Sequence, residues 1–248
     1  MANTIRLRLR CRYEEVYRRY GRVEGNWSRR RGPLVNGGWS VIGVARKRPE
    51  SFPGEFIELD LADRDKTQAL ADDLTTGGNV LGIVNDVGLA KHETISTVDP
   101  DVFATVMDLN VRPALQLTKA LLPAMRAARF GRIINITSLV TRGLAFRASY
   151  AAAKAALESL TRTMAIELAA EGITANAVAP GPTETNLFRA NSPKGSEGEA
   201  RYLSRVPMGR LALTHEVAAA IAFLAADSAS FVTGQTLFVD GGASLGTL

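Results

Sequence analysis

After residue 38, short apolar segments alternate with longer amphipathic ones, and this alternation limits the folds that the chain can adopt. The short segments have the length and apolar character of buried strands: Ser40–Ala45, Phe56–Leu59, Val80–Val84, Arg132–Thr137, Thr174–Val178 and Thr236–Val239. The longer segments have helical patterns: Asp63–Leu74, Pro100–Ala128, Tyr150–Ala170 and His215–Ala226. Strand–helix alternation predicts an α/β fold with a doubly wound parallel sheet between two layers of helices. In such sheets, ligands bind at the carboxyl ends of the strands.

The charge divides the chain into two parts. Residues 1–33 contain ten arginines and three glutamates, a net charge of +7, whereas residues 34–248 carry 20 Lys/Arg and 22 Asp/Glu, a net charge of −2. We therefore predict an atypical Arg-rich segment, residues 1–33, and a single catalytic domain, residues 34–248. A basic arm can bind nucleic acid or acidic lipid, but a solvated or aberrant terminus is the more ordinary interpretation.

The cysteine content and the hydropathy indicate the compartment. Cys11 is the only cysteine, so no intrachain disulfide can form, and a reducing cytoplasm fits. No apolar run approaches the ~20 residues that span a bilayer, and the N-terminus has no apolar signal-peptide region. We expect a cytoplasmic protein without a membrane partner.

Tyr150 and Lys154 are four residues apart, so a helix places their side chains on one face. A free tyrosine has a pKa near ~10, but a neighbouring ammonium stabilises the phenolate and lowers that pKa. Such a tyrosine can exchange a proton with a substrate oxygen. Pairs of this kind are also common on helix surfaces without any chemical role. Ser149 is the predicted N-cap of this helix, and Gly172 is its predicted end.

Two further polar residues extend this pair. Ser138 follows a predicted strand, where its hydroxyl can hydrogen-bond a substrate oxygen or serve only as a turn residue. Asn110 lies within a predicted helix, where it can hold a water that links Lys154 to solvent or can simply be solvated. Together, the four side chains suit the reduction of a ketone or the oxidation of a secondary alcohol.

The order of these residues resembles the short-chain dehydrogenase/reductase family, classical type, which has a Rossmann-like fold. The resemblance covers roughly residues 34–248 and rests on these segments: Asn85-Asp86-Val87-Gly88, Asn110, Ser138, Tyr150-Ala-Ala-Ala-Lys154, Pro180-Gly181-Pro182-Thr183-Glu184-Thr185 and Phe238-Val239-Asp240-Gly241-Gly242. Asp86 and Val87 stand where the family usually has Asn and Ala. The stretch from Pro207 to Gln235 is similar to 3-oxoacyl-thioester reductases, and also to many sugar, polyol and steroid enzymes.

The resemblance implies a role for each matching residue. Tyr150 would be the acid/base, Lys154 would lower its pKa and bind the nicotinamide ribose, and Ser138 would position the substrate, while Asn110 would complete the proton relay. The implied cofactor contacts are Asp60 and Leu61 at the adenine, Asn85, Val87 and Gly88 along the cofactor, and Pro180, Gly181, Thr183 and Thr185 at the nicotinamide. A homotetramer or homodimer is implied, through the Tyr150 helix and the last strand. No metal site is predicted.

Arg46 follows the second predicted strand, with Lys47 and Arg48 behind it. An acidic residue at this place accepts the ribose 2′-OH of NAD(H), whereas an arginine suits the 2′-phosphate of NADP(H). The alternative is a solvated run of charges. We predict NADP(H) as the favoured cofactor and NAD(H) as a possible one.

The N-terminus lacks the glycine turn with which the family begins. The segment from Tyr20 to Ser28 reads YGRVEGNWS, and Ile5, Leu7 and Leu9 alternate with arginines where an apolar first strand is expected. Read one base later, degenerate codons for Tyr20–Ser28 can encode Thr-Gly-Gly-Ser-Lys-Gly-Ile-Gly-Arg, and those for Val16–Arg19 allow Ser-Ile-Val-Val. Our hypothesis is that roughly residues 7–33 are an out-of-frame reading of an ordinary start.

Three functions compete at this point. The first is an NADP(H)-dependent oxidoreductase similar to the 3-oxoacyl reductases. The second is a catalytically impaired member of the same fold that acts as a binding protein or a subunit. The third, a nucleic-acid binder that uses the Arg-rich segment, is the least favoured. The polar stretch Asn186–Val206 is predicted to be a lid over the substrate.

Overall fold

The computed structural model describes residues 4–9, 34, 37–49, 52, 54–77 and 80–246. Residues 10–33 lie outside the described residues, and with them most of the segment to which the codon hypothesis and the nucleic-acid interpretation apply. The division of the chain at residue 34 therefore stays a prediction.

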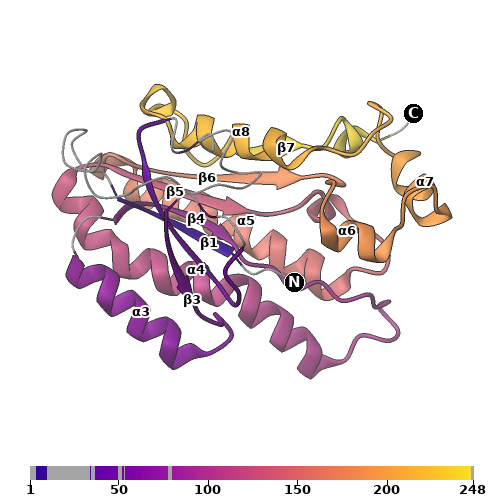
Figure 1. Cartoon of the computed structure of the whole chain (residues 1–248), viewed down its shortest axis with the longest axis horizontal. Coiled ribbons are helices and arrows are strands. Elements are labelled where there is room, and N and C mark those ends of the chain that lie inside the picture. Colours follow the sequence, from indigo (N-terminus) through magenta and orange to yellow (C-terminus); the bar gives the residue numbers. More distant parts are fainter. Residues whose placement is uncertain are drawn as a thin grey trace.

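Seven strands of the described residues form one sheet in the order β3-β2-β1-β4-β5-β6-β7 (Figure 1). The strands are β1 (Thr4–Leu9), β2 (Ser40–Ala45), β3 (Glu55–Glu58), β4 (Val80–Asp86), β5 (Gly131–Ile136), β6 (Ile173–Pro180) and β7 (Thr236–Val239). All six strands predicted after residue 38 are confirmed, β2 and β7 with the predicted bounds and the others shifted or extended by one or two residues at their ends. The doubly wound α/β sheet is thus confirmed.

The strand β1 corrects the expectation of a wholly parallel sheet. It lies between β2 and β4 and is antiparallel to both. Thr4 therefore pairs with Asp86 at the carboxyl end of β4, and Leu9 pairs with Ser40 at the start of β2. The remaining neighbours are parallel. The backbone groups of β2 and β4 can pair with a strand of either direction, because antiparallel pairing is at least as stable per residue as parallel pairing. The segment Thr4–Leu9 therefore occupies an interior position between β2 and β4, although its sequence does not look like a buried strand.

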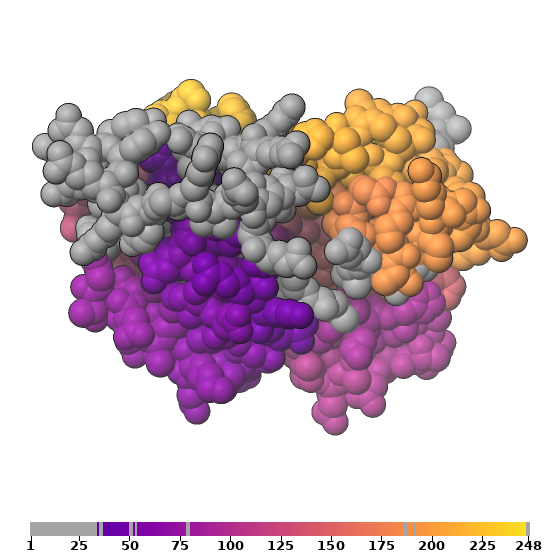
Figure 2. Space-filling model, in the orientation of Figure 1, coloured from indigo at the N-terminus to yellow at the C-terminus, as the bar shows by residue number. Residues whose placement is uncertain are grey.

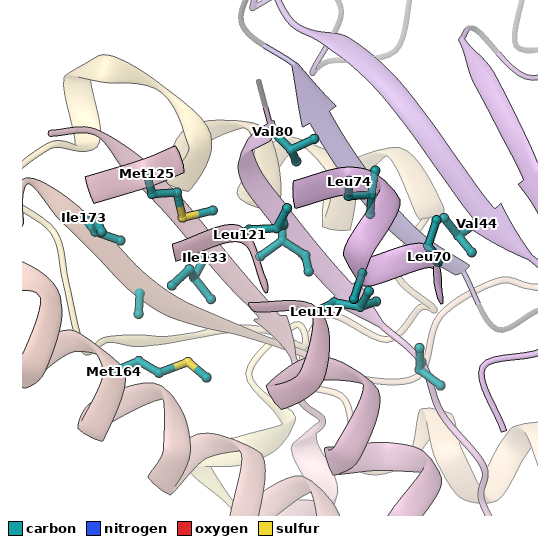
Figure 3. Close-up of a cluster of buried hydrophobic side chains, with 14 of the residues drawn as sticks. Val44, Leu70, Leu74, Val80, Leu117, Leu121, Met125, Ile133, Met164 and Ile173 are labelled. Atoms are coloured by element: carbon teal, nitrogen blue, oxygen red, sulfur yellow. The ribbon is translucent and has the colours of Figure 1, made fainter. Parts of the chain in front are cut away.

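Two hydrophobic clusters form because successive strand residues point to opposite faces of the sheet. Ile42, Ile83 and Ile133 pack with side chains of α3 (Arg64–Gly77), α4 (Pro100–Ala128) and α5 (Ala148–Leu168). Figure 3 shows this cluster, in which Leu117, Leu121 and Met125 of α4 pack with side chains of the strands and of α3 and α5. The next residues along the strands, such as Val84 and Ile134, pack against α8 (Thr214–Ala225) on the other face.

Local signals explain the bounds of α4, which match the prediction. The Asp99 side chain accepts hydrogen bonds from the backbone N–H groups of Asp101 and Val102, and Pro100 occupies the first turn, where its missing N–H costs nothing. At the other end, Arg129 adopts a left-handed conformation with φ of 46°. A left-handed residue is a frequent helix terminator, so the helix ends there.

The start of α5 differs from the prediction. The helix begins at Ala148, with Arg147 at the N-cap position, so Ser149 lies inside the first turn and is not the cap. The end agrees better: the helix is followed by a 3-10 turn, and Gly172 then has φ of 79°. A Cβ atom at Gly172 would lie 2.2 Å from the Arg129 carbonyl oxygen, so only glycine fits this close approach.

Two short helices, α6 (Asn186–Asn191) and α7 (Glu197–Leu203), form within the polar stretch that was predicted to be a lid. They project from one end of the sheet in Figure 1, and they make up much of the orange surface at that end in Figure 2. The side chain of Arg189 forms ion pairs with Glu184 and Glu199, which ties the two helices to the loop that precedes them. The role of this segment as a lid stays a prediction.

Candidate active site

Lys154 joins the carboxyl ends of two central strands to α5. Its ammonium donates hydrogen bonds to the carbonyl oxygens of Val87, which follows β4, and Ile136, which ends β5, at 2.9 and 2.8 Å. Only 2% of Lys154 is exposed. Since an ammonium has three protons, one N–H remains for a third partner. The site thus lies at the edge of the sheet where ligands bind in folds of this type.

Tyr150 lies beside this ammonium, with the Lys154 Nζ 5.6 Å from the centre of its ring. Part of the residue is exposed, but protein encloses its hydroxyl, and this burial raises the pKa of Tyr150 to about 12. The Tyr150 hydroxyl forms a hydrogen bond with the Ser138 side chain, so the two hydroxyls lie together. This hydrogen bond lowers the Tyr150 pKa and thus opposes the effect of burial. The net shift of the Tyr150 pKa is thus upward, because burial is its largest cause, and the lowering expected from Lys154 stays a prediction.

The Lys154 pKa also departs from its ordinary value. Burial lowers it to about 8, and the Asp86 carboxylate at the end of β4 opposes this shift. The same carboxylate raises the pKa of Tyr150. Asp86, which the family resemblance marks as a departure, is thus an electrostatic neighbour of both groups.

Asn110 reaches the site from α4. Its side-chain amide donates hydrogen bonds to the carbonyl oxygens of Leu89 and Val106 at 3.0 and 2.8 Å, while its Oδ1 atom is buried without a partner. A Cβ atom placed on Gly88 would lie 3.6 Å from this oxygen and 3.7 Å from the Lys154 Nζ. The glycine thus leaves a space that an acceptor and an ammonium both face. A polar space of this kind suits a bridging water.

The residues expected at the adenine end lie at the carboxyl ends of β2 and β3. Arg46 directly follows β2 and is exposed. The Asp60 carboxylate accepts a hydrogen bond from the Ala62 N–H at 3.0 Å, which fixes the turn after β3. Leu61 is fully buried, and its carbonyl oxygen accepts a hydrogen bond from the Arg112 guanidinium at 2.8 Å. Arg46 and Asp60 are accessible to a ligand, whereas the Leu61 side chain belongs to the core.

The Asn85 side chain has a different environment from the one expected. It lies on the face of β4 that α4 and α5 cover, and it donates a hydrogen bond to Asn135 at 2.8 Å. Asn135 in turn donates to Thr161 of α5 at 2.8 Å. The Asn85 side chain thus belongs to a buried polar network between β4, β5 and α5, while the Val87 carbonyl oxygen is the group of this segment that accepts a hydrogen bond from Lys154. The alternation of strand residues explains this placement.

The loop after β6 carries the residues expected at the nicotinamide end. Thr183 donates a hydrogen bond to the Gly181 carbonyl oxygen at 2.9 Å, and the Thr185 hydroxyl accepts one from Phe188 at 3.0 Å as the N-cap of α6. Pro180 is the last residue of β6. A Cβ atom on Gly181 would lie 2.7 Å from the Asp240 Cα atom, so this glycine lets the loop pack closely on the backbone at Asp240, just after β7.

Within the described residues, no cluster of His, Cys, Asp and Glu has an arrangement that could hold a metal ion. No helix in that part of the chain has the length and the apolar character that crossing a membrane requires.

A family model described as "Enoyl-(Acyl carrier protein) reductase" matches residues 43–244, which is most of the chain and includes the whole site. The chain belongs to the short-chain dehydrogenase/reductase family. Curated relatives of this dehydrogenase/reductase include the 3-oxoacyl-[acyl-carrier-protein] reductase FabG of Salmonella typhimurium, which is 39% identical over 219 residues, 84% of this chain and 88% of the relative. FabG of Escherichia coli K12 is 37% identical over 191 residues, 76% and 77% of the two chains.

Solved structures agree with this membership. A gluconate 5-dehydrogenase from Burkholderia cenocepacia J2315, in complex with NADP and tartrate, superposes with a TM-score of 0.72 at 31% identity and covers 79% of this chain and 77% of its own. Another short-chain dehydrogenase/reductase family protein has a TM-score of 0.70 at 36% identity, with 79% of each chain covered.

Sequence reasoning missed the residues that support the site from a distance. Glu93 is buried and accepts a hydrogen bond from the Ser149 N–H at 2.9 Å, although the two residues are 56 positions apart. Arg189 connects Glu184 of the nicotinamide loop to Glu199 of α7. No local pattern marks either contact, because the partners are far apart in the sequence or are ordinary polar residues of loops and short helices.

Proposed function

We propose that this short-chain dehydrogenase/reductase is an NADP(H)-dependent oxidoreductase that interconverts a ketone and a secondary alcohol, with Tyr150 as the acid/base. The observation that carries the proposal is the meeting of Tyr150, Ser138 and Lys154 at the carboxyl edge of the sheet, with the Asn110 oxygen beside them. The names of the FabG relatives support a 3-oxoacyl substrate. The gluconate 5-dehydrogenase neighbour supports a hydroxy acid as the second substrate class to test.

The residues at this edge fit a nicotinamide cofactor. Arg46 presents a guanidinium where a 2′-phosphate would bind, and its fork of donors matches phosphate oxygens. Gly88 leaves space beside Lys154 and Asn110, and the free N–H of Lys154 can bind a ribose hydroxyl. Thr183 and Thr185 lie on the loop that would hold the carboxamide. A bound NADP(H) supplies or accepts the hydride at the carbonyl carbon.

The residues of the chain then handle the oxygen and its proton. Ser138 donates a hydrogen bond to the carbonyl oxygen and holds it beside the Tyr150 hydroxyl. Tyr150, protonated at neutral pH because burial raises its pKa, donates its proton as negative charge develops on that oxygen. Lys154 and a water held by the Asn110 oxygen return a proton to Tyr150 from solvent. The alcohol oxidation uses the same steps in reverse.

The direct test is NADPH oxidation with acetoacetyl-CoA, and NADP⁺ reduction with gluconate in parallel. We expect saturable turnover of at least one substrate, in the range of about 1–10³ s⁻¹ that is common for enzymes. Replacing Ser138 with Ala should lower kcat by about 10²- to 10³-fold, because one donor to the developing oxyanion is lost. An absence of NADPH binding at millimolar concentration in equilibrium dialysis would contradict the proposal.

The cofactor preference is tested by the substitution Arg46→Asp. Loss of the guanidinium and repulsion of the 2′-phosphate should lower the ratio of kcat/KM for NADPH to that for NADH by about 10- to 100-fold, since a charge-assisted hydrogen bond contributes about 1.5–3 kcal/mol. Arg48→Asp is the matched control, because it makes the same charge change two residues away on the same exposed stretch. Equal changes in both variants would show a general electrostatic effect and would contradict a specific contact at Arg46.

We also propose a cytoplasmic location and a homotetramer or homodimer. Ile166 on α5 is 82% exposed, and Leu237 on the edge strand β7 is 38% exposed, so both elements named by the family resemblance carry apolar surface. A subunit contact through these two elements would bury both side chains.

A further inference from the structure

The first turn of α5 is capped from another part of the chain. The N-cap residue, Arg147, makes no side-chain hydrogen bond to the helix, and the Ser149 hydroxyl is buried without a partner. The Glu93 carboxylate instead accepts a hydrogen bond from the Ser149 N–H at 2.9 Å. The first N–H groups of a helix have no partner within the helix, so an outside acceptor is needed to satisfy them. Glu93 supplies that acceptor for the turn that contains Tyr150.

The segment that carries Glu93 is fastened to the loop before α5 by several contacts. The Glu93 N–H donates to the Phe146 carbonyl oxygen at 3.2 Å, and Glu93 and Arg147 form a parallel β-bridge. The Arg147 guanidinium donates to the Lys91 carbonyl oxygen at 3.1 Å. These contacts hold the carboxylate at the first turn of α5, so Glu93 is part of a built connection between the β4–α4 loop and α5.

An aromatic pair adds to this connection. The rings of His92 and Phe146 are stacked, with centroids 4.9 Å apart and planes 7° apart. Phe146 has φ of 64°, a left-handed conformation that a bulky residue adopts only where its surroundings hold it. The neighbouring segment thus stabilises an unusual backbone turn immediately before the helix.

We propose that Glu93 is a positioning residue for the catalytic tyrosine: it holds the first turn of α5 in place and thereby fixes the Tyr150 hydroxyl between Ser138 and Lys154. Tyr150 follows Ser149 directly, so any fraying of this turn moves the phenol. Acid–base catalysis requires hydrogen-bond distance between the phenol and the substrate oxygen, and a displacement of about 1 Å can cost ~10²-fold in rate. The inference rests on the proposed function for its effect on rate, but its effect on the helix turn is independent of that function.

The test compares three variants of the full chain. Glu93→Ala removes the acceptor, whereas Glu93→Gln keeps an acceptor oxygen on a side chain of the same length. Asp99→Ala is the control, because it removes the helix cap at the start of α4, away from Tyr150. We expect Glu93→Ala to lower kcat by about 10- to 100-fold with the KM for NADPH within about 2-fold, and Glu93→Gln to recover most of that loss. Asp99→Ala should lower Tm as much as Glu93→Ala, by about 2–4 °C, while kcat stays unchanged.

A second readout does not depend on turnover. Hydrogen–deuterium exchange of the amides of residues 149–152 should be at least ~10-fold faster in Glu93→Ala than in the unchanged chain, and close to normal in Glu93→Gln. Unchanged exchange in Glu93→Ala, or an equal loss of kcat in Asp99→Ala, would overturn the inference. If the unchanged chain turns over neither acetoacetyl-CoA nor gluconate, the proposed function fails, and the exchange measurement still decides whether Glu93 holds the turn.

Discussion

Replacing Tyr150 with Phe is expected to lower kcat for ketone reduction by about 10²- to 10⁴-fold, the usual contribution of a positioned proton donor. The ring is retained, so its contact with Lys154 and the packing of the first turn of α5 should persist and Tm should change by only a few degrees. What is lost is the hydroxyl that lies with Ser138 at the carboxyl edge of the sheet. Stopped-flow or steady-state measurement of NADPH oxidation gives the change in rate.

Tyr202→Phe is a matched control for this substitution. Tyr202 lies on α7, where its ring makes an edge contact with Phe188 at 5.3 Å, and the substitution removes one hydroxyl without removing a ring. Its kcat should remain within about 2-fold of the unchanged chain. A Tyr150→Phe variant that keeps more than about a tenth of the activity would exclude Tyr150 as the main acid.

The pH dependence of the same reaction follows from the two shifted groups. Tyr150, with a pKa of about 12, holds its proton across the neutral range, whereas Lys154, with a pKa of about 8, loses its charge as the pH rises through that value. Reduction should therefore proceed at a constant kcat below pH 8 and decline above it. The oxidation direction, which requires the phenolate, should be favoured by rising pH. A reduction rate that increases between pH 6 and 9 would contradict this assignment.

A change at the other end of the chain is expected to have an equally large effect. A variant in which residues 16–33 are translated one base later, so that Val16–Ser28 become Ser-Ile-Val-Val-Thr-Gly-Gly-Ser-Lys-Gly-Ile-Gly-Arg, should bind NADPH about 10²- to 10⁴-fold more tightly than the chain as printed. Glycines at such a turn let backbone N–H groups approach the pyrophosphate at a helix N-terminus. Two or more charge-assisted hydrogen bonds of about 1.5–3 kcal/mol each account for this range.

The control for this variant is the same segment with Ala in place of the motif's glycines, which should bind NADPH as weakly as the printed chain. Fluorescence titration with NADPH measures all three. The nucleotide sequence provides an independent test: codon third bases that cannot encode the alternative segment would rule out the out-of-frame origin. Intact mass would show whether the expressed polypeptide is the 26.6 kDa chain printed here.

The parts of the fold that local signals define were predictable from the sequence. The bounds of α4 follow from Asp99 and Pro100 at one end, and those of β2 and β7 from short apolar runs next to turn residues. The spacing of Tyr150 and Lys154 placed them on one helix face, and the structure brings Ser138 and Asn110 to them. These inferences succeed because each depends on residues that are neighbours in the chain or on the strand order of a parallel sheet.

The parts that distant contacts define were not predictable. The cap of α5 comes from Glu93 rather than the adjacent Ser149, because the choice between two acceptors depends on how the loop after β4 packs. The Asn85 side chain joins Asn135 in the core, which depends on the face of β4 that it occupies. The Tyr150 pKa rises because protein encloses the hydroxyl, and enclosure is a property of the folded chain alone.

The direction of β1 has a consequence for the whole N-terminal region. The gap between β2 and β4 admits a single strand, and Thr4–Leu9 occupies it with Leu9 at the edge opposite to Lys154. A Ser-Ile-Val-Val strand running parallel in the reframed chain would need the same gap, so the two segments are mutually exclusive occupants. A parallel strand in this gap would end at the edge of the sheet that holds Lys154, whereas Thr4–Leu9 ends with Leu9 at the opposite edge. The direction of the strand in this one position therefore decides whether a glycine turn placed directly after it would lie at the cofactor edge of the sheet.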